Sequence, residues 1–388
     1  MNNLIYFDNH ATTKIDQRVF DEMKLFYTNY YGNPSSINNY FGRYSNEAIN
    51  IAREKVAKLI NSDKSEIIFT SSATESNNLV IKGLAESNLK KGNHIITIST
   101  EHKSVLETCK NLEKYGFEIT ILNVDSFGNI SIKDFTNAIK KETILVSIMM
   151  ANNEIGTIHP ISEIAKICID KSILFHSDAS QCGAYLEIDV KKINPTFLTL
   201  ASHKMHGPHG ASALFVKNGF AKYLSPQIFG AGQENNLRSG TQNLTSIVGF
   251  GKACEIALNE NKSNSIKNSN LRDELQDHFT SLGDVKINGS ENKLSNNLNV
   301  TIYGVSNKEL INNTNKIIYS TGSACLNLMQ TNENYSHVLK AIGLSKSEAY
   351  STIRIGLSKF TTREEINEAK NIFSEAITNE RKKQLIKI

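Results

Sequence analysis

The stretch TLASHKMHGPHG, residues 199–210, places Lys204 between two histidines, directly after a run of apolar and small residues. Such a run is typical of a buried strand, and the polar residues after it then lie at the edge of a sheet, where open α/β sheets bind their ligands. A lysine amine becomes a nucleophile when desolvation or nearby cations lower its pKa, and His203 and His206 are candidate cations. We therefore interpret Lys204 as an amine placed to form a covalent bond; a solvated surface charge is the alternative.

Around this stretch, apolar runs alternate with segments of helical periodicity. Helical spacing of apolar residues occurs in residues 46–60, 103–114 and 161–171. The runs that resemble short buried strands are EIIFT, HIITIS, FEITIL, TILVSIMMA, ILFHSDA, FLTLAS and ASALFV. This alternation predicts an α/β fold in which helices cover a mainly parallel sheet.

The pattern changes after TSIVGFGKACEIALNE. DVKING, NNLNVTIY and IIYS are strand-like, KELINNTNK is helix-like, and TTREE announces a final amphipathic helix. At that helix start, Thr361 with Glu364, or Thr362 with Glu365, can form a capping box. We expect a smaller α+β domain from about residue 257, with the polar run NENKSNSIKNSN, residues 259–270, as the best linker candidate.

Length, charge and cysteine content exclude several classes of protein. A chain of 388 residues should form about two domains. Its formal charge of +4, from 43 basic and 39 acidic residues, is too weak and dispersed to predict a nucleic-acid or membrane partner. MNNLIYFDNHATT does not resemble a signal peptide, and no stretch is apolar enough for a membrane span, so we expect a cytoplasmic protein. Five widely spaced cysteines without a C-x-x-C pair predict neither a disulfide framework nor a metal site.

Two more strand ends carry groups that fit with Lys204. In FTSSATESNN, a strand precedes small hydroxyl residues and a helix that begins near Thr74, whose free amides suit a phosphate; an ordinary helix cap is the alternative. In ILFHSDASQ, Asp178 ends a strand, where a carboxylate can hold the proton of a pyridinium nitrogen; a helix-capping aspartate is the alternative. A phosphate site, a ring-nitrogen carboxylate and a Schiff-base lysine together predict pyridoxal 5'-phosphate.

Two further polar residues follow strands. His102, in STEHKSV, could lie over a cofactor ring and exchange protons near neutral pH, although a lone histidine is more often structural. Asn153, in ANNEIG, would offer an amide at the same edge of the sheet, although by itself it reads as a turn.

These residues stand in an ordered series of motifs: YFDNHATT, GNPSS, SSATESNN, EH, ANNEIGTIHPI, SDASQ, SHKMHGPHG, LRSGTQN, STGSAC and IRIGLSKFTT. From about residue 5 to residue 375, the chain resembles the cysteine desulfurases of the NifS/IscS group, in the class V aminotransferase family. The resemblance implies a fold-type I pyridoxal-phosphate-dependent transferase. Its large domain, residues 14–256, would hold a mainly parallel seven-stranded sheet, and residues 1–13 and 257–388 would form the small domain.

The resemblance also implies a role for each matching position. Lys204 is similar to the lysine that binds the cofactor aldehyde, Asp178 to the partner of the pyridine nitrogen, and His102 to the ring-stacking acid/base. Gln181 and Asn153 match groups around the ring hydroxyl. The positions taken for the cofactor's phosphate site are Ala73, Thr74, Ser202 and His203.

Substrate and subunit contacts are implied in the same way. Arg354, with Asn153, matches the groups that hold the substrate carboxylate, a task that suits the planar fork of a guanidinium. Thr241, in RSGT, matches a threonine that reaches the phosphate of the neighbouring subunit. The expected active unit is therefore a homodimer.

Cys325 lies in STGSACLNLMQTNENYSH, a segment rich in Gly, Ser and Asn that predicts a mobile loop, about residues 321–335. A buried structural cysteine is the alternative. The resemblance implies that the Cys325 thiolate attacks the sulfur of cofactor-bound L-cysteine, which leaves L-alanine and a persulfide. The sulfur would pass to an acceptor such as an iron–sulfur scaffold protein, for iron–sulfur cluster assembly or thio-modification.

Several positions depart from the family pattern. His10 replaces Asn or Ser, His209 replaces lysine, Lys359 replaces arginine, and LNLMQ after Cys325 is bulkier than usual. Ala201 replaces a phosphate-binding serine, and Ser202 need not supply the missing hydroxyl because neighbouring strand residues face opposite ways. Two alternative functions remain: a selenocysteine lyase or other C–S lyase with the same cofactor, and a non-catalytic scaffold subunit for sulfur-carrier assembly.

Overall fold

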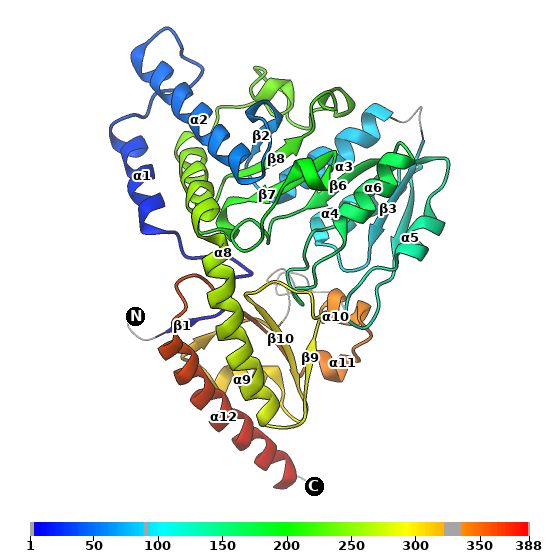
Figure 1. Cartoon of the computed structure of the whole chain (residues 1–388), viewed down its shortest axis with the longest axis vertical. Helices are drawn as coiled ribbons and strands as arrows, with labels where there is room; N and C mark the ends of the chain where they lie inside the picture. The colour runs from blue at the N-terminus through cyan, green and yellow to red at the C-terminus, as the bar shows by residue number, and fades with distance from the viewer. Residues whose placement is uncertain (1–3, 89–91, 322–334, 387–388) are drawn as a thin grey trace.

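The computed structural model describes residues 4–88, 92–321 and 335–386. A seven-stranded sheet forms the centre of its larger part, with the strand order β2-β8-β7-β6-β5-β3-β4 (Figure 1). Its strands are β2 (Ile67–Thr70), β3 (His94–Ile98), β4 (Glu118–Leu122), β5 (Thr143–Ser147), β6 (Leu174–Asp178), β7 (Phe197–Ala201) and β8 (Ser212–Val216). Of these seven strands, β8 alone runs in the direction opposite to the other six. The predicted α/β fold and mainly parallel sheet are confirmed.

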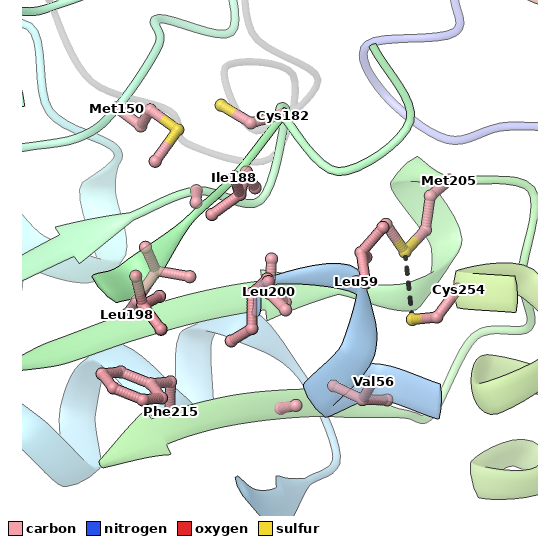
Figure 2. Close-up of a cluster of buried hydrophobic side chains, with 14 of the residues drawn as sticks. Val56, Leu59, Met150, Cys182, Ile188, Leu198, Leu200, Met205, Phe215 and Cys254 are labelled. Carbon is pink, nitrogen blue, oxygen red and sulfur yellow. Dashed lines mark hydrogen bonds between the residues drawn. The ribbon is translucent and has the colours of Figure 1, made fainter. Parts of the chain in front are cut away.

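Except at the edge strand β4, which is partly exposed, both faces of this sheet are buried, and this burial is why most of its strands are continuous apolar runs rather than alternating ones. Within β2, Phe69 packs into the core shared with α1, α2 and α8, whereas its neighbour Ile68 packs into the core under α3 and α4. Figure 2 shows part of the first core, where Leu198, Leu200 and Phe215 of the sheet lie in the same cluster as side chains of α2 and α8.

The helices and short strands outside the large sheet are as follows. The helices are α1 (Gln17–Thr28), α2 (Tyr40–Leu59), α3 (Ala73–Asn88), α4 (Lys103–Glu113), α5 (Ile132–Ala138), α6 (Ile161–Asp170), α7 (Val190–Ile193), α8 (Leu244–Ser281), α9 (Asn307–Asn313), α10 (His337–Ala341), α11 (Lys346–Ala349) and α12 (Arg363–Ile386). The remaining strands are β1 (Ile5–Tyr6), β9 (Val285–Asn288), β10 (Asn297–Ile302), β11 (Ile317–Ile318) and β12 (Thr352–Gly356).

A second core lies in the smaller part of the molecule. There β12, β10 and β9 form an antiparallel sheet, and β1 pairs with β11. Apolar side chains of β10 and β12 pack with those of α12 and of the last turns of α8. At the start of α12, the Thr362 amide donates to Glu365 Oε2 over 2.9 Å and the Glu365 amide donates to Thr362 Oγ1 over 3.2 Å, so the second of the two expected capping pairs is the one that forms.

The prediction that residues 259–270 form a linker is wrong. Residues 259–270 lie inside α8, a continuous helix of 38 residues that runs from the large sheet to the small one (Figure 1). Its first half packs into the large core through residues such as Phe250, and its last turns pack into the second core through Leu275 and Phe279. The Asn- and Ser-rich middle is helical because both ends are fixed by burial, and tertiary packing overrides local propensity. Among the described residues, none of the helices combines the length and apolarity needed to cross a membrane.

Candidate active site

A cavity of about 270 Å³ opens where the carboxyl ends of β5, β6 and β7 meet the start of α3. It brings together most of the residues that the sequence singled out. Those that line it are Ala73, Thr74, His102, Asn153, Asp178, Gln181, His203, Lys204 and Arg354. Parallel strands place their carboxyl ends at one edge, and this common edge explains why residues so distant in sequence converge.

Lys204 lies in a 3₁₀ turn, η2 (Ser202–Lys204), directly after β7. Its Nζ donates hydrogen bonds to the carbonyl oxygens of His10 and Ala11, the latter over 2.7 Å. The amine is therefore held at the rim of the sheet, as predicted, by the backbone of the segment that follows β1.

Asp178 ends β6 and is buried. Its Oδ1 accepts from the Ser180 amide at 2.9 Å and the Ser180 hydroxyl at 2.5 Å, and its Oδ2 accepts from Nδ2 of Asn77 at 2.7 Å. Each carboxylate oxygen can accept about two hydrogen bonds, so Oδ2 keeps room for one more donor.

His102 caps α4, and its Nδ1 accepts a hydrogen bond from the Ser104 amide at 3.1 Å. Burial lowers the pKa of His102, and the nearby charge of Lys204 lowers it further, while Asp178 opposes the shift. A neutral imidazole whose Nδ1 accepts an N–H bond carries its proton on Nε2.

Gln181 and His10 form a pair beside Lys204. Nε2 of Gln181 donates to the carbonyl of His10 at 3.1 Å, and Oε1 lies 3.0 Å from Nδ1 of His10. Burial, together with the charges of Arg354 and Lys204, lowers the pKa of His10 to about 3. The ring is therefore neutral, and its Nδ1–H donates to Gln181.

Three residues of the cavity lining suit an anion. Ala73 and Thr74 lie at the start of α3, whose free amides and positive end attract negative charge. His203 lines the same cavity, and burial, with the charge of Lys204, lowers its pKa to about 3. Its Nδ1 lies 3.1 Å from Oγ1 of Thr12, which in turn lies 3.1 Å from Nε2 of His209.

Two of the predicted cofactor contacts do not line this cavity. Ser202 is buried, and a Cβ on Gly207 would stand 2.2 Å from its Oγ, so the hydroxyl is directed toward Gly207; Ala201 lines the cavity instead. Thr241 is exposed and also lies away from the cavity. Cys325 lies outside the described residues.

Arg354, on β12, is 1% exposed. Its Nη2 donates to Asp8 Oδ1 at 2.7 Å and its Nη1 to the carbonyl of Asn153 at 3.1 Å. Its buried Nε has no hydrogen-bond partner within the part of the chain that the structure describes. A buried guanidinium with an unused donor beside a cavity is suited to bind a carboxylate.

Three polar residues behind the cavity were not singled out from the sequence. They are Asp8, Asn77 and Ser104. Asp8 and Asn77 lie in the quoted motifs YFDNHATT and SSATESNN, and Asn77 lies one helical turn after Ala73, on the side of α3 that faces the cavity. That spacing was the available signal.

The residues present fit pyridoxal phosphate. An amine, a carboxylate with a free acceptor position, a neutral imidazole and a helix start line one cavity, and these are the groups that bind, respectively, its aldehyde, ring nitrogen, ring face and phosphate. Among residues 4–88, 92–321 and 335–386, no group of three or more His, Cys, Asp or Glu side chains is placed to hold a metal ion.

Comparisons with known proteins agree with this chemistry. The family model described as Aminotransferase class-V matches residues 5–368. A protein of Clostridium botulinum named cysteine desulfurase IscS is 42% identical over 387 residues, which cover 98% of this chain and 96% of that protein. A solved structure titled NIFS-like protein has a TM-score of 0.90 at 37% identity and covers 97% of this chain and 99% of that one. A second, titled SspA in complex with cysteine, has a TM-score of 0.81 at 37% identity and covers 92% of this chain and 100% of that one.

Proposed function

This chain belongs to the aminotransferase class-V family, and we propose from that premise that it is a pyridoxal-phosphate-dependent cysteine desulfurase, which releases L-alanine from L-cysteine and mobilises the sulfur. One observation carries the proposal: Lys204, Asp178, His102 and Arg354 line a single cavity. The relatives that are named as cysteine desulfurases, and the related structure titled as a complex with cysteine, support the same substrate.

The cofactor supplies an aldehyde that condenses with amines and a ring that accepts the electrons of a broken bond. The chain's own residues would hold and direct it. We assign Lys204 to the aldehyde, Asp178 to the ring nitrogen and Gln181 to the ring hydroxyl, with the start of α3 and His203 at the phosphate. His102, neutral and with its proton on Nε2, is the group that we assign to ring stacking and to proton exchange with the substrate.

Arg354 would bind the substrate carboxylate and so fix the orientation of the cysteine. Its Nη1 and Nη2 already contact the carbonyl of Asn153 and Asp8, and its buried Nε remains available. A substrate carboxylate that accepts a hydrogen bond from Nε would remove the free-energy cost of this unsatisfied buried donor. A substrate without a carboxylate would not provide this contribution to binding.

We propose that Cys325 receives the sulfur. Its thiolate would attack the substrate sulfur; the C–S bond breaks, an S–S bond forms, and carbon takes up a proton, which gives alanine and a persulfide with no external oxidant. The persulfide would then pass to an acceptor such as an iron–sulfur scaffold protein. A cytoplasmic location suits this thiol chemistry, and Cys109, Cys168, Cys182 and Cys254 are all free.

We also propose a homodimer in which Thr241 contacts the neighbouring site. Its exposure supports this assignment. An exposed aromatic cluster on and between α1 and α2 also supports the homodimer. In this cluster the ring centroids of Tyr31 and Phe41 lie 5.6 Å apart, and those of Tyr40 and Tyr44 lie 6.2 Å apart. Contiguous exposed aromatic residues mark protein interfaces, where tyrosine is enriched.

The test is to load the purified protein with pyridoxal phosphate and supply cysteine with a thiol reductant. Equal amounts of alanine and sulfide are expected, and borohydride reduction followed by peptide mass analysis should find the cofactor on Lys204. Cys325→Ser should bind the cofactor normally but release no sulfide from cysteine, while Cys109→Ala keeps its activity.

Three outcomes would contradict the proposal. A cofactor adduct on another lysine would overturn the assignment of Lys204. Unchanged sulfide release by Cys325→Ser would favour a lyase. A protein that stays colourless and inactive after cofactor addition would favour a scaffold subunit.

A further inference from the structure

Asn77 connects two groups of the site that do not touch each other. It lies on α3, is fully buried, and donates from Nδ2 to Asp178 Oδ2 over 2.7 Å and to Ser104 Oγ over 2.8 Å. Ser104 Oγ lies 2.8 Å from Nδ1 of His102. The chain of contacts thus runs from the end of β6, through α3 and the first turn of α4, to the histidine that caps α4.

The direction of each hydrogen bond follows from the chemistry of the partners. An ionised carboxylate can only accept, so the side of Asn77 that faces Asp178 must be its NH₂ group. That group has two hydrogens, and the second points to Ser104 Oγ. Because Ser104 Oγ accepts this bond, its own hydrogen is left to donate to Nδ1 of His102.

The chain of contacts therefore fixes the hydrogen-bonding role of the group at each end. At one end, Asp178 accepts three donors and keeps one acceptor position on Oδ2. At the other end, Nδ1 of His102 accepts from the hydroxyl and the amide of Ser104 and cannot carry a proton. The buried Oδ1 of Asn77 has no partner, so the residue is retained at a cost that its two donated bonds must offset.

We propose that Asn77 is a positioning residue for the reaction: it orients Asp178 as an acceptor for the ring nitrogen and, through Ser104, keeps the His102 proton on Nε2. This inference rests on the proposed function. Without Asn77, Oδ2 of Asp178 loses a hydrogen-bond donor and would compete more strongly for the proton of a bound ring nitrogen. The Ser104 hydroxyl also loses the bond that fixes its direction.

The test compares Asn77→Ala and Asn77→Asp with the matched control Asn78→Ala. Asn78 is the next residue of α3 and bonds to the Thr74 carbonyl and to Thr108, outside this chain of contacts. Each protein is loaded with pyridoxal phosphate labelled with ¹⁵N in the ring. In the wild type and in Asn78→Ala, the ¹⁵N NMR chemical shift of the ring should be that of a protonated nitrogen. In Asn77→Ala, this chemical shift should move toward the value of an unprotonated nitrogen. The kcat of Asn77→Ala should also be about tenfold lower, because the loss of one hydrogen bond to a charged group has about that effect.

Asn77→Asp is the sharper variant, because it replaces a donor to Asp178 with a second carboxylate, and like charges disfavour ionisation. Its ring-nitrogen shift should move at least as far. With ¹⁵N-labelled histidine, the chemical shift of Nδ1 of His102 should be that of an unprotonated, hydrogen-bonded nitrogen in the wild type. In both variants this chemical shift should change.

A residue that only fills space would give a different result. In that case Asn77→Ala would lower the melting temperature and leave both nitrogen signals of the loaded protein unchanged, which would overturn the inference. Failure of the wild type to bind the cofactor on Lys204 would instead overturn the proposed function, so the two failures are distinguishable.

Discussion

Nη2 of Arg354 lies 2.7 Å from Oδ1 of Asp8. The two residues are 346 positions apart in sequence, and the parallel bridge between Asp8 and Gly356 brings them together. The Arg354 side chain is 1% exposed and that of Asp8 19%, so the pair is largely removed from solvent. A guanidinium in such a place needs a nearby negative charge, and Asp8 provides it before any substrate arrives.

We predict that Asp8→Ala lowers the free energy of unfolding by about 3 kcal/mol, because it leaves the buried Arg354 charge without a partner. The double variant Asp8→Ala/Arg354→Leu should cost less than the sum of the two single variants, since the uncompensated charge is then absent. Urea denaturation of the cofactor-free wild type, the two single variants and the double variant measures the four unfolding free energies of this double-mutant cycle. Asp21→Ala, at an exposed site, serves as the control, and strictly additive effects would argue against the pairing.

A second prediction concerns pH and His159. The ring is buried, neither nitrogen has a hydrogen-bond partner, and burial lowers its pKa to about 4. The unfolded chain binds a proton near pH 6.5 and the folded chain near 4, so the titration of this histidine does not change stability above pH 6.5 and destabilises the fold progressively as pH falls toward 4. His159→Leu should therefore reduce proton uptake on unfolding at pH 5 by about one proton.

The measurement is the pH dependence of the unfolding free energy of His159→Leu and the wild type between pH 5 and 8. Above pH 7, the unfolding free energies of the two proteins should change with pH at the same slope. Below pH 7, the two curves should diverge. Parallel curves over the whole range would show that His159 binds its proton at the same pH in the folded and the unfolded chain, which contradicts the prediction.

The helical nature of residues 259–270 gives a third prediction. Lys262 is exposed in the middle of α8. A proline there removes a backbone hydrogen bond and clashes with the preceding turn, at a cost of about 3 kcal/mol, whereas Lys262→Ala should be neutral within about 0.5 kcal/mol. If the segment were a flexible linker, the two variants would have equal melting temperatures.

The sequence was sufficient for those parts of the fold that depend on local pattern. Every strand of the large sheet coincides with an apolar run, and for all but the partly exposed edge strand β4 the cause is burial on both faces. The middle of α8 could not be predicted, because its Asn and Ser residues are held helical by burial at Phe250 and Phe279, far along the chain on either side. Pairings such as Asp8 with Arg354 likewise depend on a bridge between the two ends of the chain, which no local pattern records.

The residues of the candidate site likewise include some that the sequence predicts and some that it does not. Residues at strand ends, such as Asp178 and Lys204, were predictable because parallel strands deliver their carboxyl ends to one edge. The contacts of Asn77 were not, because its partners Asp178 and Ser104 lie on β6 and α4, and only the packing of α3 against both brings them together. Ser202 shows a third case: the chain turns into η2 after Ala201, and the hydroxyl is directed toward Gly207 and away from the cavity.

This arrangement gives the last prediction. Ala201 lines the cavity with a methyl group, whereas the Ser202 hydroxyl is buried, is directed toward Gly207 and has no hydrogen-bond partner among the described residues. Ala201→Ser should add a donor that a bound phosphate can use, and the dissociation constant of pyridoxal phosphate should fall roughly three- to tenfold, as expected for one added hydrogen bond. Ser202→Ala should leave it unchanged.

Titration of the cofactor-free protein with pyridoxal phosphate and with pyridoxal, which lacks the phosphate, separates this contact from others in the cavity. The gain in Ala201→Ser should appear with pyridoxal phosphate alone, because only that ligand carries the acceptor that the new hydroxyl meets. An equal gain with both ligands would mean that the hydroxyl acts on the ring or on Lys204. Weaker binding by Ser202→Ala, with no change in Ala201→Ser, would reverse the assignment of the two side chains.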